Sequence, residues 1–118
     1  MAVHSIAFIM YPVTDVPRAV AFYTDTVGLS QAGHSMPYWV EFEVGGATFG
    51  VGNFEQVGVA GTAQSLALEV DDMAVSRAGL DAKGVASSEP FETPICWISG
   101  FADPDGNKIW LHQLKAAK

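Results

Sequence analysis

The sequence predicts an α+β fold in which one βαβββ unit occurs twice. Two predicted helices each begin at an aspartate, Asp15 and Asp72, whose side chain can cap the first turn. A β-prone segment precedes each helix, and a hairpin signal ends each half of the chain. Repetition of the same element order indicates two similar modules rather than a doubly wound parallel sheet.

In the first half, an apolar and β-prone stretch predicts a strand over residues 4–11. A helix follows from Asp15 to about Thr26, with apolar residues at helical spacing and Gly28 just past its end. The polar connection over 30–35 can include a short strand. Residues 38–44 and 47–51 are strand-like and flank Gly45-Gly46, which is typical of a two-residue hairpin.

The second half follows a glycine-rich loop over 52–61 and repeats this order. It contains a predicted strand over 65–70, a helix over about 73–83, a strand around 95–98 and a final hairpin over 101–113. The turn Asp103-Pro104-Asp105-Gly106 suits that hairpin, because proline presets φ and glycine accepts a positive φ. In the last strand, alternation places Trp110 and His112 on one face and Ile109 and Leu111 on the other.

The two halves align when Gly46 is matched with Gly106. This match pairs Gly50 with Trp110 and Glu41 with Phe101. We therefore predict a single domain over 1–118, with module 1 at about 1–53 and module 2 at about 62–118. Each module forms a half-open sheet with a helix on its outer face, so a cavity can lie between the inner faces.

Composition restricts the function and the location of the protein. The 118 residues are 49% hydrophobic and 16% charged, which is typical of a globular domain, and the formal net charge is −7. Negative charge disfavours nucleic acid and anionic membranes as partners, and it either suits a cationic ligand mildly or serves only solubility. Cys96 is the single cysteine, which excludes an intrachain disulfide and favours a reducing, cytoplasmic location. The first eleven residues lack a basic head and a long apolar run, so we expect no signal peptide and no membrane span there.

Several motifs occur together in register: Ala21-Phe22-Tyr23, Val27-Gly28-Leu29, Val70-Asp71-Asp72 and Asp103-Pro104-Asp105-Gly106-Asn107. In this combination the chain resembles the vicinal oxygen chelate superfamily. That superfamily includes glyoxalase I, the bleomycin and fosfomycin resistance proteins, extradiol dioxygenases and methylmalonyl-CoA epimerase. The resemblance implies a glyoxalase/bleomycin resistance fold, a barrel-like pair of half-open sheets and a homodimer.

The resemblance also implies where a metal ion would bind. Metal-using members place one ligand on the first and one on the last strand of each module, commonly two His or Gln and two Glu. The corresponding positions here are Phe8, Gly50, Ser65 and Trp110. Phenylalanine, glycine and tryptophan offer no side-chain donor to a metal, and a lone serine hydroxyl is a poor ligand. We therefore expect no cofactor.

Aromatic and polar side chains are predicted to line the cavity instead. The predicted ligand-binding residues are Phe8, Met10, Trp39, Glu41, Ser65, Trp97, Trp110 and His112. In an alternative prediction, His4, Glu41 and His112 supply the ligand types of a relocated 2-His-1-carboxylate site for Zn, Ni, Mn or Fe. In another alternative, Glu41 acts as a catalytic general base whose pKa is raised by an apolar cavity.

Three functions follow from these observations. The first is a metal-independent small-molecule binding protein, similar to the bleomycin resistance branch, that sequesters an aromatic or cationic compound. The second is a lyase, isomerase or dioxygenase of the same superfamily with a relocated metal or Glu-base site. The third is a dimerising or regulatory module with a collapsed cavity. The sequence leaves open whether the modules pair within one chain or across a dimer, because that depends on the 52–61 connection.

Overall fold

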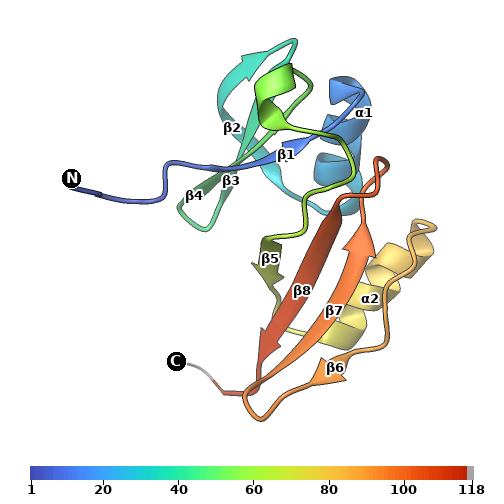
Figure 1. Cartoon of the computed structure of the whole chain (residues 1–118). Coiled ribbons are helices and arrows are strands. Elements are labelled where there is room, and N and C mark those ends of the chain that lie inside the picture. Colours follow the sequence, from blue (N-terminus) through green and yellow to red (C-terminus); the bar gives the residue numbers. More distant parts are fainter. Residues whose placement is uncertain (117–118) are drawn as a thin grey trace.

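Two four-stranded sheets, one from each half of the chain, form the framework of the computed structural model, which describes residues 1–116 (Figure 1). The first sheet has the order β1-β4-β3-β2 and the second the order β5-β8-β7-β6. In each sheet the first pair of strands is parallel and the other pairs are antiparallel. The strands are β1 (Ile9–Pro12), β2 (Ser30–Met36), β3 (Trp39–Val44), β4 (Ala47–Gly52), β5 (Leu66–Glu69), β6 (Phe91–Glu92), β7 (Cys96–Ala102) and β8 (Lys108–Leu114). The predicted α+β fold class is confirmed.

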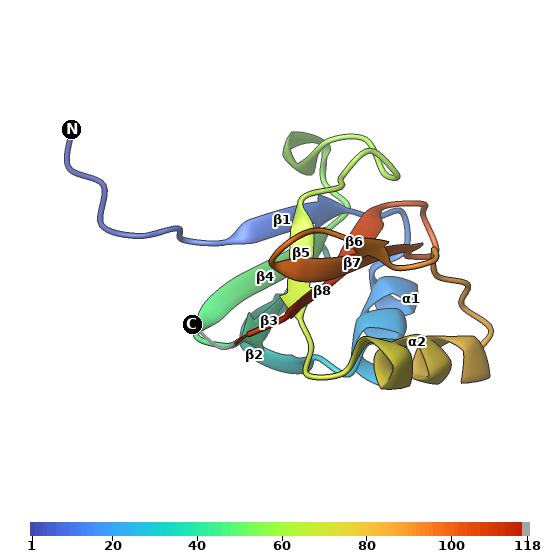
Figure 2. The ribbon, with the colours of Figure 1, turned by 90° about the horizontal axis from the view of Figure 1, so that it is seen from below.

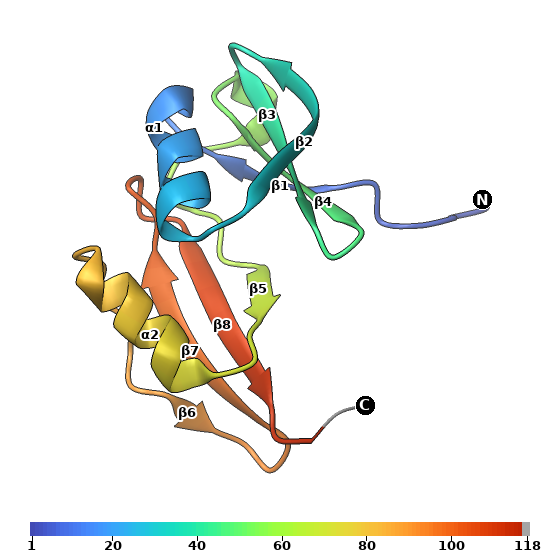
Figure 3. The same ribbon diagram turned by 180° about the vertical axis from the view of Figure 1, so that it is seen from behind.

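Both helices begin at the predicted aspartates. The Asp15 side chain accepts a hydrogen bond from Arg18 N at the start of α1 (Val16–Ala21), and that of Asp72 accepts one from Val75 N at the start of α2 (Met73–Ala82). These caps satisfy backbone N–H groups that have no partner within the helix. Helix α1 continues into a π-helical turn, η1 (Phe22–Thr26), and a short 3₁₀ turn, η2 (Glu55–Val57), follows β4. Both α-helices lie on the same side of the molecule (Figures 2 and 3).

The first strand is shorter than predicted. Strand β1 begins at Ile9 instead of residue 4, and residues 1–8 form an exposed arm that leads away from the sheet (Figure 1). The neighbouring strand explains the difference: Ile9 pairs with Phe49, and β4 begins only two residues earlier, at Ala47. The earlier part of the arm therefore has no strand beside it with which to form a ladder.

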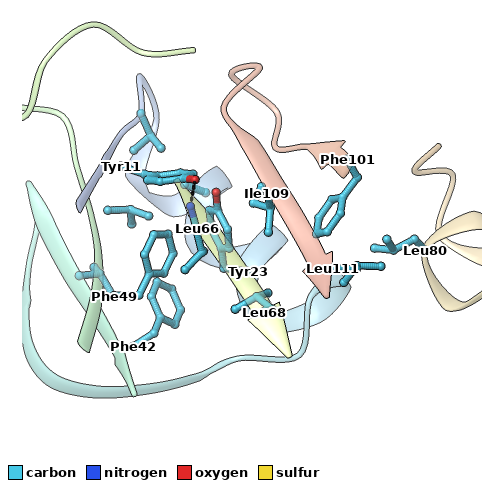
Figure 4. Close-up of a cluster of buried hydrophobic side chains, with 14 of the residues drawn as sticks. Tyr11, Tyr23, Phe42, Phe49, Leu66, Leu68, Leu80, Phe101, Ile109 and Leu111 are labelled. Atoms are coloured by element: carbon cyan, nitrogen blue, oxygen red, sulfur yellow. Dashed lines mark hydrogen bonds between the residues drawn. The ribbon is translucent and has the colours of Figure 1, made fainter. Parts of the chain in front are cut away.

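One continuous core lies between the sheets and the helices (Figure 4). Its fully buried side chains include Tyr11, Tyr23, Phe42, Phe49 and Ile109. The Tyr11 hydroxyl joins the two modules, because it donates to Lys108 O at 2.6 Å and accepts from Leu66 N at 2.7 Å. The two modules are therefore joined through one core, to which both contribute buried side chains.

The final hairpin is also tied to the first module. The Tyr23 hydroxyl donates to Asp103 Oδ2 at 2.8 Å, and Asn107 Nδ2 donates to Pro12 O at 2.7 Å. The other Asp103 oxygen accepts from the backbone N–H groups of Asp105 and Asn107. These hydrogen bonds hold the turn predicted from the sequence in place. They also give the buried side chains of Asp103 and Asn107 hydrogen-bond partners.

The predicted alignment of the two modules, which matches Glu41 with Phe101, is wrong by one residue: the position equivalent to Glu41 is Gly100. Glu41 lies opposite Gly50 in the first hairpin, whereas the residue opposite Trp110 is Gly100. The second hairpin contains one more residue, because Asp103 N bonds to Asn107 O and leaves three residues in the turn, against two at Gly45-Gly46. A shift of one residue moves side chains to the opposite face of a strand.

Within residues 1–116, no helix is long and apolar enough to cross a membrane.

Candidate ligand-binding site

Each sheet carries an open pocket on the face turned away from the shared core. The first, of about 420 Å³, is lined by Phe8, Met10, Met36, Tyr38, Trp39, Glu41 and Phe54. The second, of about 510 Å³, is lined by Ala67, Ser88, Phe91, Ile98, Trp110 and His112. We call these pockets the first and the second half-site, because each is lined by residues of one module only.

Trp39 forms the floor of the first half-site by lying on two glycines. A Cβ atom at Gly50 would lie 2.2 Å from the indole Cζ2, and one at Gly52 would lie 2.9 Å from Cε3. Such distances are too short for any side chain at Gly50, so the indole occupies the space into which a longer residue would project. Phe8 packs edge-on against the same ring, with 5.4 Å between ring centroids.

The Glu41 carboxylate is held beside this indole by two N–H donors. Its Oε2 accepts from Trp39 Nε1 at 2.9 Å, and its Oε1 accepts from His34 N at 3.1 Å. Gly33 lies in an irregularity of β2 with φ +79°, and a Cβ there would lie 2.4 Å from Oε1. The hydrogen bonds from Trp39 and His34 lower the pKa of the Glu41 carboxyl. The expected rise in this pKa is therefore wrong, because hydrogen bonding outweighs desolvation.

The second half-site has a similar floor, but here the tryptophan lies on the last strand of the module, β8, and the glycine on the strand before it, β7. The Trp110 ring lies over Gly100, whose Cβ would be 3.0 Å from Cζ3, and its Nε1 donates to Gln64 O at 2.9 Å. The Lys108 ammonium lies 4.8 Å from the ring centroid. At the other end of this half-site, His112 Nδ1 lies 2.5 Å from Glu69 Oε1.

A family model covers most of the chain. The model of the Glyoxalase/Bleomycin resistance protein/Dioxygenase superfamily matches residues 5–111. The chain belongs to this superfamily. In the comparison with curated proteins, no sequence matched the chain.

Solved structures of this superfamily have the same fold. The chain is similar to TnmS3, an antibiotic binding protein from Streptomyces sp. CB03234, with 30% identity, a TM-score of 0.85 and coverage of 98% of this chain and 99% of that one. It is also similar to a glyoxalase/bleomycin resistance protein from the same organism, with 32% identity, a TM-score of 0.80 and coverage of 92% and 100%. A lactoylglutathione lyase from Agrobacterium tumefaciens shares the fold at 19% identity, with a TM-score of 0.78 and 92% of each chain covered.

The residues at the superfamily's metal positions do not fit a metal ion. Phe8 and Trp110 offer aromatic surface, and the Trp110 N–H is already donated to a carbonyl. At Gly50 the Trp39 indole fills the space that a ligand side chain would need. Ser65, the remaining position, is exposed and supplies only a hydroxyl. These four positions therefore lack the imidazole and carboxylate groups that Zn, Ni, Mn and Fe ions prefer as ligands.

The alternative trio of His4, Glu41 and His112 is not brought together within one chain. His4 lies in the exposed arm, Glu41 lines the first half-site and His112 lines the second. Within residues 1–116, no group of three or more His, Cys, Asp or Glu side chains is placed to hold a metal ion.

The predicted cavity residues separate into the two half-sites. Four of them line the first half-site and two line the second: Phe8, Met10, Trp39 and Glu41, then Trp110 and His112. Ser65 lies just before β5, outside both linings. Trp97 packs against the core instead of the second half-site, because the longer hairpin turns Ile98 toward the pocket.

Sequence reasoning missed several residues of the second half-site. Phe91 lies on the short strand β6, where no strand was expected, and Ile98 lines the half-site although only its neighbour Trp97 was predicted to do so. Glu69 was overlooked as the partner of His112, although alternation along β5 puts it on the same face as Ala67. That alternation was the available signal.

Proposed function

We propose that this protein binds a flat aromatic small molecule without a metal ion and sequesters it. The observation that carries the proposal is the Trp39 indole lying on Gly50, at a position where metal-using relatives have a ligand. An aromatic surface takes the place of the metal centre there. The similarity to an antibiotic binding protein supports a role in holding a small molecule.

The electrostatics of the first half-site favour a ligand with a positive charge. The Glu41 carboxylate is ionised at neutral pH, its pKa being lowered further by hydrogen bonds, and it lies at the N–H edge of Trp39 in a half-site that Tyr38 also lines. A carboxylate and aromatic faces both attract cations, and the net charge of −7 adds a favourable long-range field. We therefore propose a planar aromatic cation as the ligand class.

We further propose that the binding protein is a cytoplasmic homodimer. The two half-sites are open and belong to different sheets, and large apolar side chains remain exposed at them, including Tyr38 (49%) and Phe91 (65%). Under twofold symmetry, the first half-site of each protomer can face the second half-site of its partner. Two closed cavities would result, each with aromatic walls on both sides.

Binding of proflavine, a planar aromatic cation, tests the function. Equilibrium dialysis should show saturable binding that is unchanged after treatment with a chelator, and weaker binding of the neutral analogue acridone. Trp39→Ala should reduce affinity for proflavine at least about tenfold, because the buried indole supports Phe8 and orients Glu41, and the loss of an aromatic wall of this kind costs about 1–3 kcal/mol. Trp97→Ala is the matched control, since Trp97 lies outside both half-sites.

Elemental analysis of the purified protein tests whether its function is independent of metal ions. We expect near-zero metal content before and after incubation with Zn²⁺, Ni²⁺, Mn²⁺ and Fe²⁺. One tightly held metal ion per site would overturn the metal-independent function and would direct attention to His4, Glu41 and His112 across two chains.

The enzymatic alternative has less support. A carboxylate whose pKa is lowered is a weaker base, so Glu41 is poorly suited to removing a proton from carbon. If turnover of any substrate is found, Glu41→Gln tests this residue directly: full loss of turnover in a folded variant would favour the enzyme, and retained turnover would exclude Glu41 as its base.

A further inference from the structure

A histidine and a glutamate face each other on neighbouring strands at the second half-site. Glu69 on β5 and His112 on β8 are register partners in a parallel pair. His112 Nδ1 lies 2.5 Å from Glu69 Oε1, and Glu69 Oε2 accepts from Leu114 N at 2.9 Å. Both carboxylate oxygens are therefore engaged, and the glutamate is fixed from two sides.

This geometry selects one tautomer of the imidazole. An ionised carboxylate only accepts hydrogen bonds, so the hydrogen between the two groups belongs to Nδ1. In the neutral ring, Nε2 then carries a lone pair and is an acceptor. Within residues 1–116, Nε2 makes no hydrogen bond of its own.

Among the residues that line this half-site, His112 Nε2 is a hydrogen-bond acceptor surrounded mainly by apolar side chains. Trp110, Phe91, Ile98 and Ala67 contribute apolar surface. The other polar side chain, Ser88, accepts from Gly100 N at 2.8 Å, and its hydroxyl can serve as a donor rather than as the main acceptor for a ligand. A hydrogen bond formed against such an apolar wall gains strength from the low local polarity.

We propose that His112, positioned by Glu69, accepts a hydrogen bond from an acidic hydroxyl group, a phenol or an enol, on the ligand. This inference rests on the proposed function and specifies the chemistry of the second half-site. His112 contacts the ligand, and Glu69 is a positioning residue that acts through the imidazole. The ligand class is thereby narrowed to flat aromatics that carry a hydroxyl at the end bound by module 2.

A matched pair of probes tests the hydrogen bond. 2-Naphthol and 2-methoxynaphthalene have nearly the same shape, but only the first can donate. By calorimetry, the wild-type protein should bind 2-naphthol about tenfold more tightly, as expected for one hydrogen bond to an apolar-walled acceptor. His112→Leu should bind both probes equally, and Glu69→Leu should lose most of the difference. Glu89→Gln removes one negative charge at an exposed side chain and should leave the difference intact.

The outcomes separate this inference from the proposed function. Equal affinity of the wild-type protein for the two probes would overturn the role of His112 while leaving aromatic binding in place. Failure of both naphthalenes and proflavine to bind would overturn the proposed function itself.

Nitrogen-15 NMR of the His112 ring provides a test that needs no ligand. We expect the Nδ1–H tautomer in the wild-type protein and its loss in Glu69→Leu. An Nε2–H tautomer in the wild-type protein would overturn the assignment of Glu69 as the positioning residue, whatever the binding results.

Discussion

Tyr23 shows how a single side chain can serve both modules. Its hydroxyl is buried and donates to Asp103 in the final hairpin. Burial raises the pKa of Tyr23 far above its ordinary value, and the neighbouring Asp103 charge raises it further. The phenol therefore remains a hydrogen-bond donor throughout the normal pH range.

Tyr23→Phe should lower the free energy of unfolding by about 1–3 kcal/mol, because Asp103 would lose a buried donor. Urea denaturation followed by circular dichroism measures this change. Tyr38→Phe is the control, since that side chain is half exposed and its hydroxyl donates to the Met36 sulfur instead of to a buried carboxylate. A loss no greater than that of the control would show that the hydrogen bond between the modules does not stabilise the fold.

The lowered pKa of Glu41 makes a specific prediction about pH. A group whose pKa is lower in the folded state stabilises the fold above its unfolded-state pKa, here about 4.3, and loses that contribution as the pH falls through the folded-state pKa. Glu41→Gln should therefore be less stable than the wild type at pH 6, by no more than about 1 kcal/mol because the carboxylate is partly open to water.

This difference should shrink as urea titrations are carried from pH 6 toward pH 3. A difference that is constant across this range, or one that grows as pH falls, would contradict the lowered pKa. The exposed substitution Glu89→Gln serves as the control for a lost negative charge.

The sequence placed Trp39 and Glu41 on one strand face correctly, because alternation depends only on spacing within a strand. The direction of the Glu41 pKa could not be predicted in the same way. It depends on the His34 backbone N–H, which an irregularity near Gly33 aims at the carboxylate. Such a backbone donor has no side-chain signature.

At the level of elements, the length of the second hairpin explains why the prediction for Trp97 failed. Both hairpins were located from their turn residues, but the second has one more residue than the first. Trp97 consequently packs against the core instead of lining the cavity as predicted, and Ile98 lines the second half-site. Alternation gives the relative orientation of side chains within a strand, whereas the hydrogen-bonded register fixes which face is which.

Helix α2 contains a glycine that its packing does not require. A Cβ at Gly79 would meet nothing within 4 Å, because the position borders a groove of about 330 Å³. Gly79→Ala should therefore stabilise the protein by about 0.5–1 kcal/mol, since alanine loses less conformational freedom in a helix. Thermal and urea unfolding measure the change.

Gly50→Ala provides the contrasting substitution on a strand. Its Cβ would meet the Trp39 indole at 2.2 Å, so we expect destabilisation there. A Gly79→Ala variant that is less stable than the wild type would mean that α2 needs its glycine for a reason other than space.

At the scale of the whole molecule, the chain is broad and open. The described residues extend over 40 × 38 × 23 Å with a radius of gyration of 14.6 Å, compared with ~13.5 Å for a compact domain of this length. The two half-sites lie on separate modules of the same chain, joined through the core behind them. The sequence predicted both linings in part, but not their separation, because residues 52–61 carry no pattern that fixes the angle between modules.

Mixing two inactive variants tests whether the site forms across a dimer. Met10→Lys should block the first half-site and Phe91→Lys the second, and both positions are exposed, at 38% and 65%. Each variant alone should not bind proflavine. After joint unfolding and refolding, heterodimers should each contain one intact cavity and restore about a quarter of the wild-type sites.

Sites built within one chain would give no restoration, because every chain in the mixture carries a blocked half-site. Size-exclusion chromatography with light scattering before and after mixing verifies that dimers are present. A monomer that binds proflavine would contradict the proposed assembly.

The contact between Trp39 and Gly50 also restricts how this protein can change through evolution. Any mutation that introduces a metal-binding side chain at position 50 clashes with the indole, since even a Cβ atom there would lie 2.2 Å from it. Loss of Trp39 first would empty the floor of the half-site and remove the indole N–H that donates to Glu41. A metal-binding side chain at position 50 therefore requires a second substitution at Trp39, and each of the two single variants is expected to be impaired.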